Sequence, residues 1–442
     1  MSDAFLLVGP NGCGKSRALQ LLSDKSRIDG AALARVLFPD LSIGAASLLP
    51  QGSQRAIFST SVRSLLVGPL VYSGLTIEES EVKVHALLQR FSFSHLLTRN
   101  YFTLSGGEKQ FVSLFSALLW DVNTYLLDDP LAMLDRERAC EALTVLIEFN
   151  RTDAKKQMVV GTTDVGLYSA VRDGSSVHGR QVVHLGYAPD HETCVSQFDS
   201  LLRSVDLKGM ARVEVKLESL TVAPFGRCLL DKEEMVLVAG QLFIVTGKNG
   251  EGKSCFLQVL AGLRRAQSGR IAISDGRAIT KPVAGETTLY LPQDSSGVLG
   301  FGTVREELTG RTVPEWWRKV LEFLYDWRVL EPNDRAAEGS FGEVRFRATL
   351  AILGAAARKH KELVMLLLDE PDVGLDRLRN SLLARLLGWL AKDNLLVAIV
   401  THHPDRYQGV SSRVGQLVLQ NKKLQCCALP DHERGENAIV SC

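Results

Sequence analysis

The sequence predicts two tandem α/β domains, each built on a mostly parallel β-sheet flanked by helices. The first observation is a set of apolar runs that alternate with helical stretches, as expected for strands buried on both faces of a sheet. These runs are 5–8, 47–50, 124–127 and 158–161 in the first half, and 242–246, 288–291, 364–368 and 395–400 in the second. The second observation is a glycine-rich loop after one run in each half, GPNGCGKS at 9–16 and GKNGEGKS at 247–254. Both loops fit the phosphate-binding pattern GxxxxGK[ST], which predicts a P-loop NTPase fold for each domain.

The third observation is an internal repeat. Four motifs recur in the same order at an interval of roughly 240 residues. The matching pairs are Lys15 and Lys253, Gln51 and Gln293, Ser105 and Ser340, and Asp128 and Asp369. A constant order at a nearly constant interval indicates duplication, and a chain of 442 residues has room for two domains. We predict a first domain at 1–187, a connector with a short helix at 188–210, and a second domain at 211–442.

Composition excludes several classes of protein. A net charge of +1 argues against a dedicated nucleic-acid-binding protein, which usually carries a basic excess. The eight cysteines have no CxxC spacing, so neither a zinc site nor a disulfide framework is predicted. No apolar run approaches the roughly 18 residues of a membrane span, and no signal peptide is recognised at the start. These features predict a cytosolic protein.

The motif LSGGEKQ at 104–110 opens an apolar helix with a serine and two glycines. Unpaired amides at a helix N-terminus attract anions, so this motif predicts close approach by a phosphate. Two aspartates, Asp128 and Asp129, end the apolar run that follows. Taken in order, the phosphate loop, the glutamine, LSGGE and LLDDP resemble the nucleotide-binding domain of ABC ATPases. The resemblance implies an ABC helical subdomain in each half, and it implies ATP and Mg²⁺ as ligands.

The resemblance assigns roles to residues of both halves. Glu370 is the expected general base for the attacking water, and Gln293 and His402 complete the expected catalytic set. The expected Mg²⁺ ligands are Ser16 and Asp128 in the first half, and Ser254, Gln293 and Asp369 in the second. The expected ATP contacts are Gly9, Pro10, Asn11, Gly12, Cys13, Gly14, Lys15, Ser16 and Gln51 in the first half, Phe225, Gly247, Lys248, Asn249, Gly250, Glu251, Gly252, Lys253 and Ser254 in the second, and Ser105, Gly106 and Gly107 in LSGGE.

Members of this family carry an antiparallel hairpin before the phosphate loop, with an aromatic residue that stacks on adenine. The second half has room for it, and Phe225 is the expected aromatic residue. Only eight residues precede Gly9. The first domain is therefore expected to lack most of the hairpin, unless the true start lies upstream of Met1.

The resemblance also implies that the two domains pair head to tail. Each ATP would then lie between the phosphate loop of one half and the LSGG-type motif of the other. Asp129 replaces the catalytic glutamate and Thr163 the histidine in the first half, while Gly339 and Phe341 alter the motif in the second. These departures, together with the missing hairpin, fall in one composite site. Independent drift would have damaged both sites, so we predict one degenerate and one competent site.

The segments after the two glutamines resemble those of ATPases from energy-coupling factor (ECF) importers of vitamins and metals. The matching residues are Ile57, Phe58, Val62, Gly68 and Pro69 in the first half, and Thr303, Val304, Glu306 and Glu307 in the second. Arg63, Ser64 and Leu65 depart from the acidic run usual there. The resemblance implies a membrane partner of the T-component type and a substrate-binding membrane subunit, with this chain on the inner face of the cell membrane.

Two other functions remain open. One is a soluble twin ABC ATPase that acts on ribosomes or DNA. The polar stretch at 188–210 is short for the charged helical linker of translation-factor types, and no insertion or zinc site of repair types is visible. The other is the ATPase of a sugar importer, which also uses fused domains. The leading hypothesis is the ATPase of an ECF-type importer, with no nucleic-acid partner.

Overall fold

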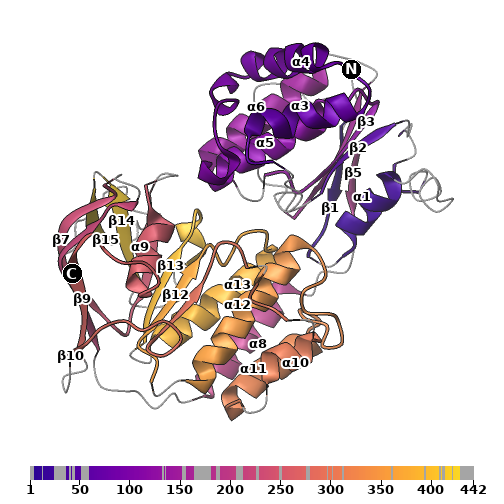
Figure 1. Ribbon diagram of the computed structural model, residues 1–442. Helices are drawn as coiled ribbons and strands as arrows, with labels where there is room; N and C mark the ends of the chain where they lie inside the picture. Colours follow the sequence, from indigo (N-terminus) through magenta and orange to yellow (C-terminus); the bar gives the residue numbers. More distant parts are fainter. Residues whose placement is uncertain are drawn as a thin grey trace. The chain divides into compact units, whose positions relative to one another are not determined.

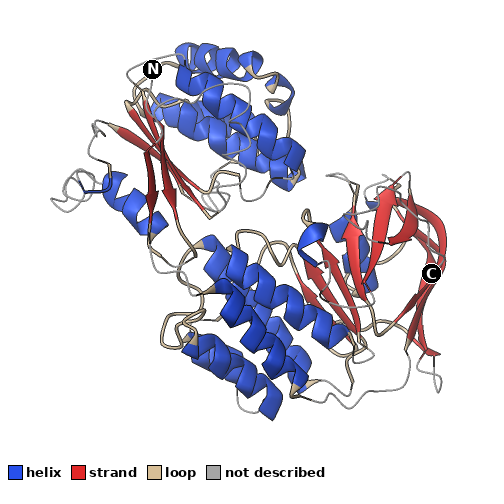
Figure 2. Cartoon of the chain, turned by 180° about the vertical axis from the view of Figure 1, so that it is seen from behind, coloured by secondary structure: helices blue, strands red, loops and turns tan. Residues whose placement is uncertain are grey.

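The computed structural model divides the chain into two compact units, residues 1–188 and 189–442. It describes residues 4–11, 13–23, 36–38, 41, 45–50, 59–131, 134, 136–151, 156–163, 181–185, 190–205, 213–224, 228–247, 251–274, 279–295, 297–300, 302–310, 313–359, 362–392, 395–407, 410, 414–420 and 422–428. Both units are α/β, as predicted (Figures 1 and 2). The domain bounds and the connector given above stay predictions.

The first unit is built on a parallel five-stranded sheet in the order β2-β3-β4-β1-β5. Its strands are β1 (Ala4–Val8), β2 (Ala46–Leu49), β3 (Thr124–Asp128), β4 (Gln157–Thr162) and β5 (Gln181–His184). Successive side chains of a strand point to opposite faces. In β1, Phe5 and Leu7 accordingly join one buried cluster with helix α1 (Lys15–Ser23), and Leu6 and Val8 join another. The continuous apolar runs therefore cover both faces of the sheet.

The cluster that includes Leu6 and Val8 also includes buried residues from four helices of the first unit. They are α3 (Val62–Tyr72), α4 (Ile77–Arg90), α5 (Gly106–Leu118) and α6 (Arg136–Arg151), and Figure 2 shows them on the opposite side of the sheet from α1. The helix starts are encoded locally. Thr76 with Glu79 and Ser105 with Glu108 form capping boxes at α4 and α5, which satisfy backbone amides that lack a partner inside the helix. These helices and one face of the sheet share a single buried cluster.

The second unit contains two sheets. The larger has the order β11-β12-β13-β8-β14-β15 and is parallel except for its last pair. Its strands are β8 (Leu242–Thr246), β11 (Thr288–Leu291), β12 (Met365–Asp369), β13 (Leu396–Val400), β14 (Val414–Gln420) and β15 (Lys423–Ala428). Helix α9 (Lys253–Leu260) packs on one face. On the other lie α8 (His191–Arg203), α10 (Val304–Thr309), α11 (Glu315–Asp326), α12 (Phe341–Arg358) and α13 (Arg377–Ala391).

The smaller sheet is antiparallel, with strands β6 (Glu214–Val222), β7 (Leu230–Val238), β9 (Ser268–Ser274) and β10 (Ile279–Thr280). The pair β6–β7 is the hairpin expected before the second phosphate loop. Every strand pair described in the first unit is parallel.

Helix α8, in the stretch predicted as a connector, packs into the core of the second unit. Cys194, Phe198 and Leu202 are buried there against α11 and α13. Asp199 pairs with Arg385 of α13 at 3.4 Å. The apolar face of α8 covers apolar side chains of α13, and this burial stabilises the attachment of α8 to the second unit.

Candidate active site

The phosphate loop of the second unit links β8 to α9. Gly252 adopts φ 99°, a left-handed conformation that side chains disfavour. A Cβ at Gly252 would also lie 2.3 Å from Leu229 Cδ1. Lys253, which begins α9, is buried, and its Nζ donates to the Gly247 carbonyl at 2.8 Å. The loop lysine is thus held at the N-terminus of a helix, where a phosphate binds favourably.

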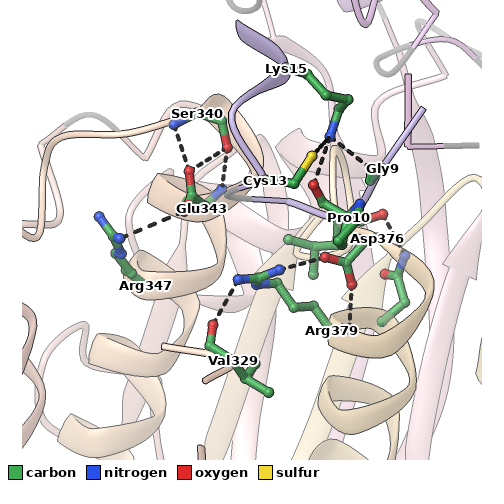
Figure 3. Close-up of polar contacts among 12 residues, drawn as sticks. Gly9, Pro10, Cys13, Lys15, Val329, Ser340, Glu343, Arg347, Asp376 and Arg379 are labelled. Atoms are coloured by element: carbon green, nitrogen blue, oxygen red, sulfur yellow. Dashed lines mark hydrogen bonds and ion pairs between the residues drawn. The ribbon is translucent and has the colours of Figure 1, made fainter. Parts of the chain in front are cut away.

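The phosphate loop of the first unit repeats this geometry (Figure 3). Lys15 Nζ donates to the carbonyls of Gly9 at 2.7 Å and Pro10 at 2.8 Å, and it lies 3.8 Å from Cys13 Sγ. Gly14 adopts φ 95°, which matches Gly252. Among the described residues, the two loops therefore share the contact from the lysine to the first glycine and the left-handed glycine before that lysine.

Asp369 ends β12 at the carboxyl edge of the larger sheet, where ligands of parallel sheets bind. Its side chain is fully buried, and the Tyr290 hydroxyl donates to Oδ2 at 3.2 Å. Burial raises the pKa of Asp369 to about 6, with a further rise from the charge of Glu370, while the Ser254 hydroxyl opposes it. Oδ1 has no hydrogen-bond partner among the described residues. A buried carboxylate oxygen left open beside a loop serine fits a Mg²⁺ ligand.

Glu370 lies at the centre of the predicted catalytic set. Its Oε2 accepts a hydrogen bond from Gln293 Nε2 at 3.1 Å, and His402 Nε2 lies 3.2 Å from Oε1. Burial acts to raise the pKa of Glu370, but the contacts with His402 and Gln293 and the charge of Arg345 outweigh it and hold this pKa below its usual value. The structure therefore brings Gln293, Glu370 and His402 together and keeps the carboxylate in its basic form.

The corresponding turn of the first unit has the same backbone. Asp129 has φ 48° and Glu370 has φ 52°, both unusual for residues other than glycine. The Asp129 amide donates to Gly161 O at 2.8 Å, as the Glu370 amide does to Val400 O at 2.9 Å. The halves differ here in side chains, because Asp129 is one methylene shorter than Glu370 and Thr163 stands where the second half has His402.

The LSGG-type motifs begin α5 and α12 in the same way. Ser105 caps α5 through Glu108, and Ser340 caps α12 through Glu343, with Ser340 N donating to Glu343 Oε2 at 3.0 Å (Figure 3). Gly106 and Gly107 fill the first turn of α5, where α12 has Phe341 and Gly342. The two motifs therefore differ at the first helical position, which is glycine in α5 and phenylalanine in α12.

Two residues near Glu370 were not predicted from the sequence. Tyr290 of β11 contacts Asp369, as described above. Arg345 of α12 is buried and donates to backbone carbonyls on both sides of the site, including Glu370 O at 3.1 Å. Six predicted ATP contacts lie outside the described residues, namely Gly12, Gln51, Phe225, Lys248, Asn249 and Gly250.

Comparison with known proteins decides the family. The sequence model of the ABC transporter family matches residues 2–132 and 230–373. The chain belongs to the ABC transporter family. It is an ATPase with two tandem domains of this family.

Curated relatives of this ABC ATPase match along most of its length. A putative ABC transporter ATP-binding protein of Treponema denticola is 23% identical, with 96% of this chain and 90% of that protein covered. One of Sulfurisphaera tokodaii is 27% identical over 94% of this chain and 90% of that protein. Among solved structures, an archaeal ribosome recycling factor in complex with a ribosomal stalk protein has a TM-score of 0.53 at 19% identity, covering 96% of this chain and 85% of that one. That likeness is one of fold.

Within the described part of this ABC ATPase, no helix has both the length and the apolar character of a membrane span. The helices of the first unit nevertheless carry exposed apolar side chains. Tyr72 is 92% exposed at the end of α3, and Ile77 and Val82 of α4 are 57% and 70% exposed. Helices α3 and α4 pack together and follow the first glutamine loop in sequence.

Proposed function

We propose that this ABC ATPase is the ATP-hydrolysing subunit of a membrane importer, of the energy-coupling factor type, for a small molecule such as a vitamin or a metal ion. The observation that carries the proposal is the match to curated ABC transporter ATP-binding proteins along both halves. The segments after Gln51 and Gln293, which resemble those of ECF ATPases, support the finer assignment. In this proposal the chain lies in the cytoplasm against the inner face of the membrane.

The exposed side chains of α3 and α4 support a protein partner. Single exposed apolar residues are common on any protein, but several on two packed helices are a candidate interaction surface. We assign the exposed apolar residues of α3 and α4, which are Val71, Tyr72, Ile77 and Val82, to contact with the cytoplasmic segments of a polytopic membrane subunit. A partner of the T-component type would dock there in the first half.

Hydrolysis is assigned to a single composite site. Glu370 would take a proton from the attacking water, Gln293 would orient that water, and His402 would hold Glu370 and contact the γ-phosphate. Lys253 and the loop amides would bind the phosphates, and Ser254 and Asp369 would hold Mg²⁺. Bound Mg²⁺ would offset the negative charge that develops on the phosphates. Head-to-tail pairing of the two domains would supply Ser105 and Gly107 from the first half.

The other composite site is proposed to bind ATP without efficient hydrolysis. Lys15, Ser16, Gln51 and Asp128 would supply binding groups there. Asp129 carries its carboxylate about 1 Å short of the position of a glutamate, a misplacement that typically costs on the order of 10²-fold in rate. Thr163 cannot replace the imidazole. This site would hold nucleotide while the other turns over.

Affinity purification of the tagged chain from native membranes tests the transporter assignment. We expect a polytopic membrane protein to co-purify, and we expect Tyr72→Ser with Val82→Ser to weaken its recovery. Gln89→Ser, an exposed polar change on α4, is the matched control and should retain the partner. Recovery of ribosomes or DNA in place of a membrane protein would overturn the assignment.

The second candidate is a soluble twin ABC ATPase that acts on ribosomes. The observation in its favour is the tandem fold shared with the archaeal ribosome recycling factor along 96% of this chain. At 19% identity this likeness concerns the fold alone. Fractionation of a detergent-free lysate before the purification decides between the two. This chain sediments with ribosomes if it acts on them, and with membranes if it is a transporter subunit.

A further inference from the structure

Arg345 connects three segments around the catalytic glutamate. It lies in the second turn of α12 and is 1% exposed. Its Nη1 donates to Pro292 O at 2.6 Å and to Gln293 O at 3.1 Å, and its Nε donates to Glu370 O at 3.1 Å. Its Nη2 donates to Asp369 O. One guanidinium therefore joins α12, the glutamine loop and the end of β12.

Burying the charged guanidinium costs hydration free energy, which argues against a role in core packing alone. An arginine removed from water loses hydration that only good partners replace, and an uncharged side chain of similar size often packs as well. Burial accordingly lowers the pKa of Arg345, although the charges of Glu370, Asp369 and Asp372 oppose the change. Retaining such a group indicates that its fixed fork of donors is used.

The first half supplies an internal comparison. Gln110 stands five residues after Ser105, as Arg345 stands five residues after Ser340. Gln110 is also buried, and its Nε2 donates to Pro130 O at 2.8 Å. An amide has two N–H groups and no charge, so it cannot make the four bonds of the guanidinium. The four-way connection belongs to the half that carries Glu370.

We propose that Arg345 is a positioning residue for ATP hydrolysis, which fixes the glutamine loop against the β12 end so that Gln293 and Glu370 meet. This inference rests on the proposed role of Glu370. Gln293 and Glu370 are each held by their own backbone carbonyl, and their side chains then lie 3.1 Å apart. The hydrogen bonds of the Arg345 side chain described above all go to backbone carbonyls, and none goes to His402, the residue predicted to contact the γ-phosphate. ATP binding is therefore not expected to depend on Arg345 directly.

Steady-state phosphate release by the full chain tests the proposal. Arg345→Gln installs the residue of the first half. Loss of the fork lets the two loops shift, and a displacement of about 1 Å at the reacting groups typically costs on the order of 10²-fold. We expect kcat to fall by about that factor, the KM for ATP to stay within about threefold, and nucleotide binding to persist. Arg347→Gln is the matched control on the same helix, because Arg347 is also a buried arginine but its Nη1 donates to Arg335 O rather than to the glutamine loop or the end of β12. Its expected kcat is within about twofold of wild type.

Arg345→Lys separates geometry from charge, and it also serves if Arg345→Gln fails to fold. Lysine keeps the charge but loses the planar fork, so we expect kcat well below wild type at an unchanged KM. A wild-type kcat in Arg345→Lys would overturn the proposal, as would a loss in either variant that appears in KM alone. Glu370→Gln is measured in parallel. If Glu370→Gln releases almost no phosphate while Arg345→Gln hydrolyses ATP at the wild-type rate, the positioning role of Arg345 is wrong and the assignment of Glu370 as the base is kept. If Glu370→Gln hydrolyses ATP at the wild-type rate, the assigned hydrolysis site itself is wrong.

Discussion

Replacing Glu370 by glutamine should nearly abolish ATP hydrolysis while leaving ATP binding intact. The substitution keeps the size of the side chain but removes the group that would take a proton from water. A general base typically contributes 10²–10⁴-fold, roughly 3–5 kcal/mol of barrier. The change also replaces one of the two acceptor oxygens that face Gln293 and His402 at 3.1 and 3.2 Å by an N–H donor.

Asp129 provides the matched control for that experiment. Its backbone conformation is nearly that of Glu370, with φ 48° against 52°, so the same chemical change is made in the same turn of the first half. Asp129→Asn should lower the rate by less than about threefold, since the misplaced carboxylate contributes little. Asp129→Glu should not rescue Glu370→Gln, because Thr163 and Phe341 remain. Phosphate release is measured with the membrane fraction present. An Asp129→Asn enzyme as slow as Glu370→Gln would refute the asymmetry.

Three further outcomes are expected. Tyr290→Phe removes the hydroxyl that holds Asp369 Oδ2, and loss of such a partner typically weakens metal affinity by about 10–100-fold, which a Mg²⁺ titration of ATPase activity measures. With its pKa raised to about 6, Asp369 is increasingly protonated below that pH, so calorimetry should show Mg²⁺ affinity falling about tenfold per pH unit there and steady above pH 7. After turnover and rapid desalting, about one nucleotide should remain per chain, and Lys15→Ala should abolish that retention.

Each of these outcomes has a counterpart that would contradict its reasoning. An unchanged Mg²⁺ requirement in Tyr290→Phe would mean that the hydroxyl does not orient Asp369. A Mg²⁺ affinity independent of pH between about 5 and 7 would place the metal on other groups. Loss of the retained nucleotide in Lys253→Ala, with retention preserved in Lys15→Ala, would assign the slow site to the second phosphate loop.

The sequence predicted the parts of the site that follow from local chemistry. The pattern GxxxxGK[ST] requires a loop between a strand and a helix, and both loops have that form. Asp369 and Glu370 end an apolar run, which places them at the carboxyl edge of a parallel sheet next to the loop. The cap of α12 was also readable, because Ser340 followed three residues later by glutamate is a helix-start signal.

Contacts between segments that are far apart in the sequence could not be predicted from local patterns. Tyr290 and Asp369 are 79 residues apart, and Arg345 and Pro292 are 53 apart, so no local pattern links them. Arg345 occupies a helix position that hydrophobic periodicity assigns to the core, and nothing about a single sequence says that a cation is buried there. Comparing the halves shows a glutamine, Gln110, opposite Arg345, but only the structure shows that both positions are buried.

The two halves show that a turn and its chemistry can be separated. A left-handed residue other than glycine costs on the order of 1 kcal/mol, yet the conformation persists at Asp129, where the glutamate is lost, as it does at Glu370. In both halves the amide of that residue donates to the next strand, to Gly161 O or Val400 O. The turn is therefore stabilised by its contact with the neighbouring strand in both halves. What distinguishes the second half is the set of side chains built on that common backbone. The carboxylate of Glu370 there is held from one side by Gln293 and from the other by His402, and the Arg345 guanidinium fixes the backbone beneath it.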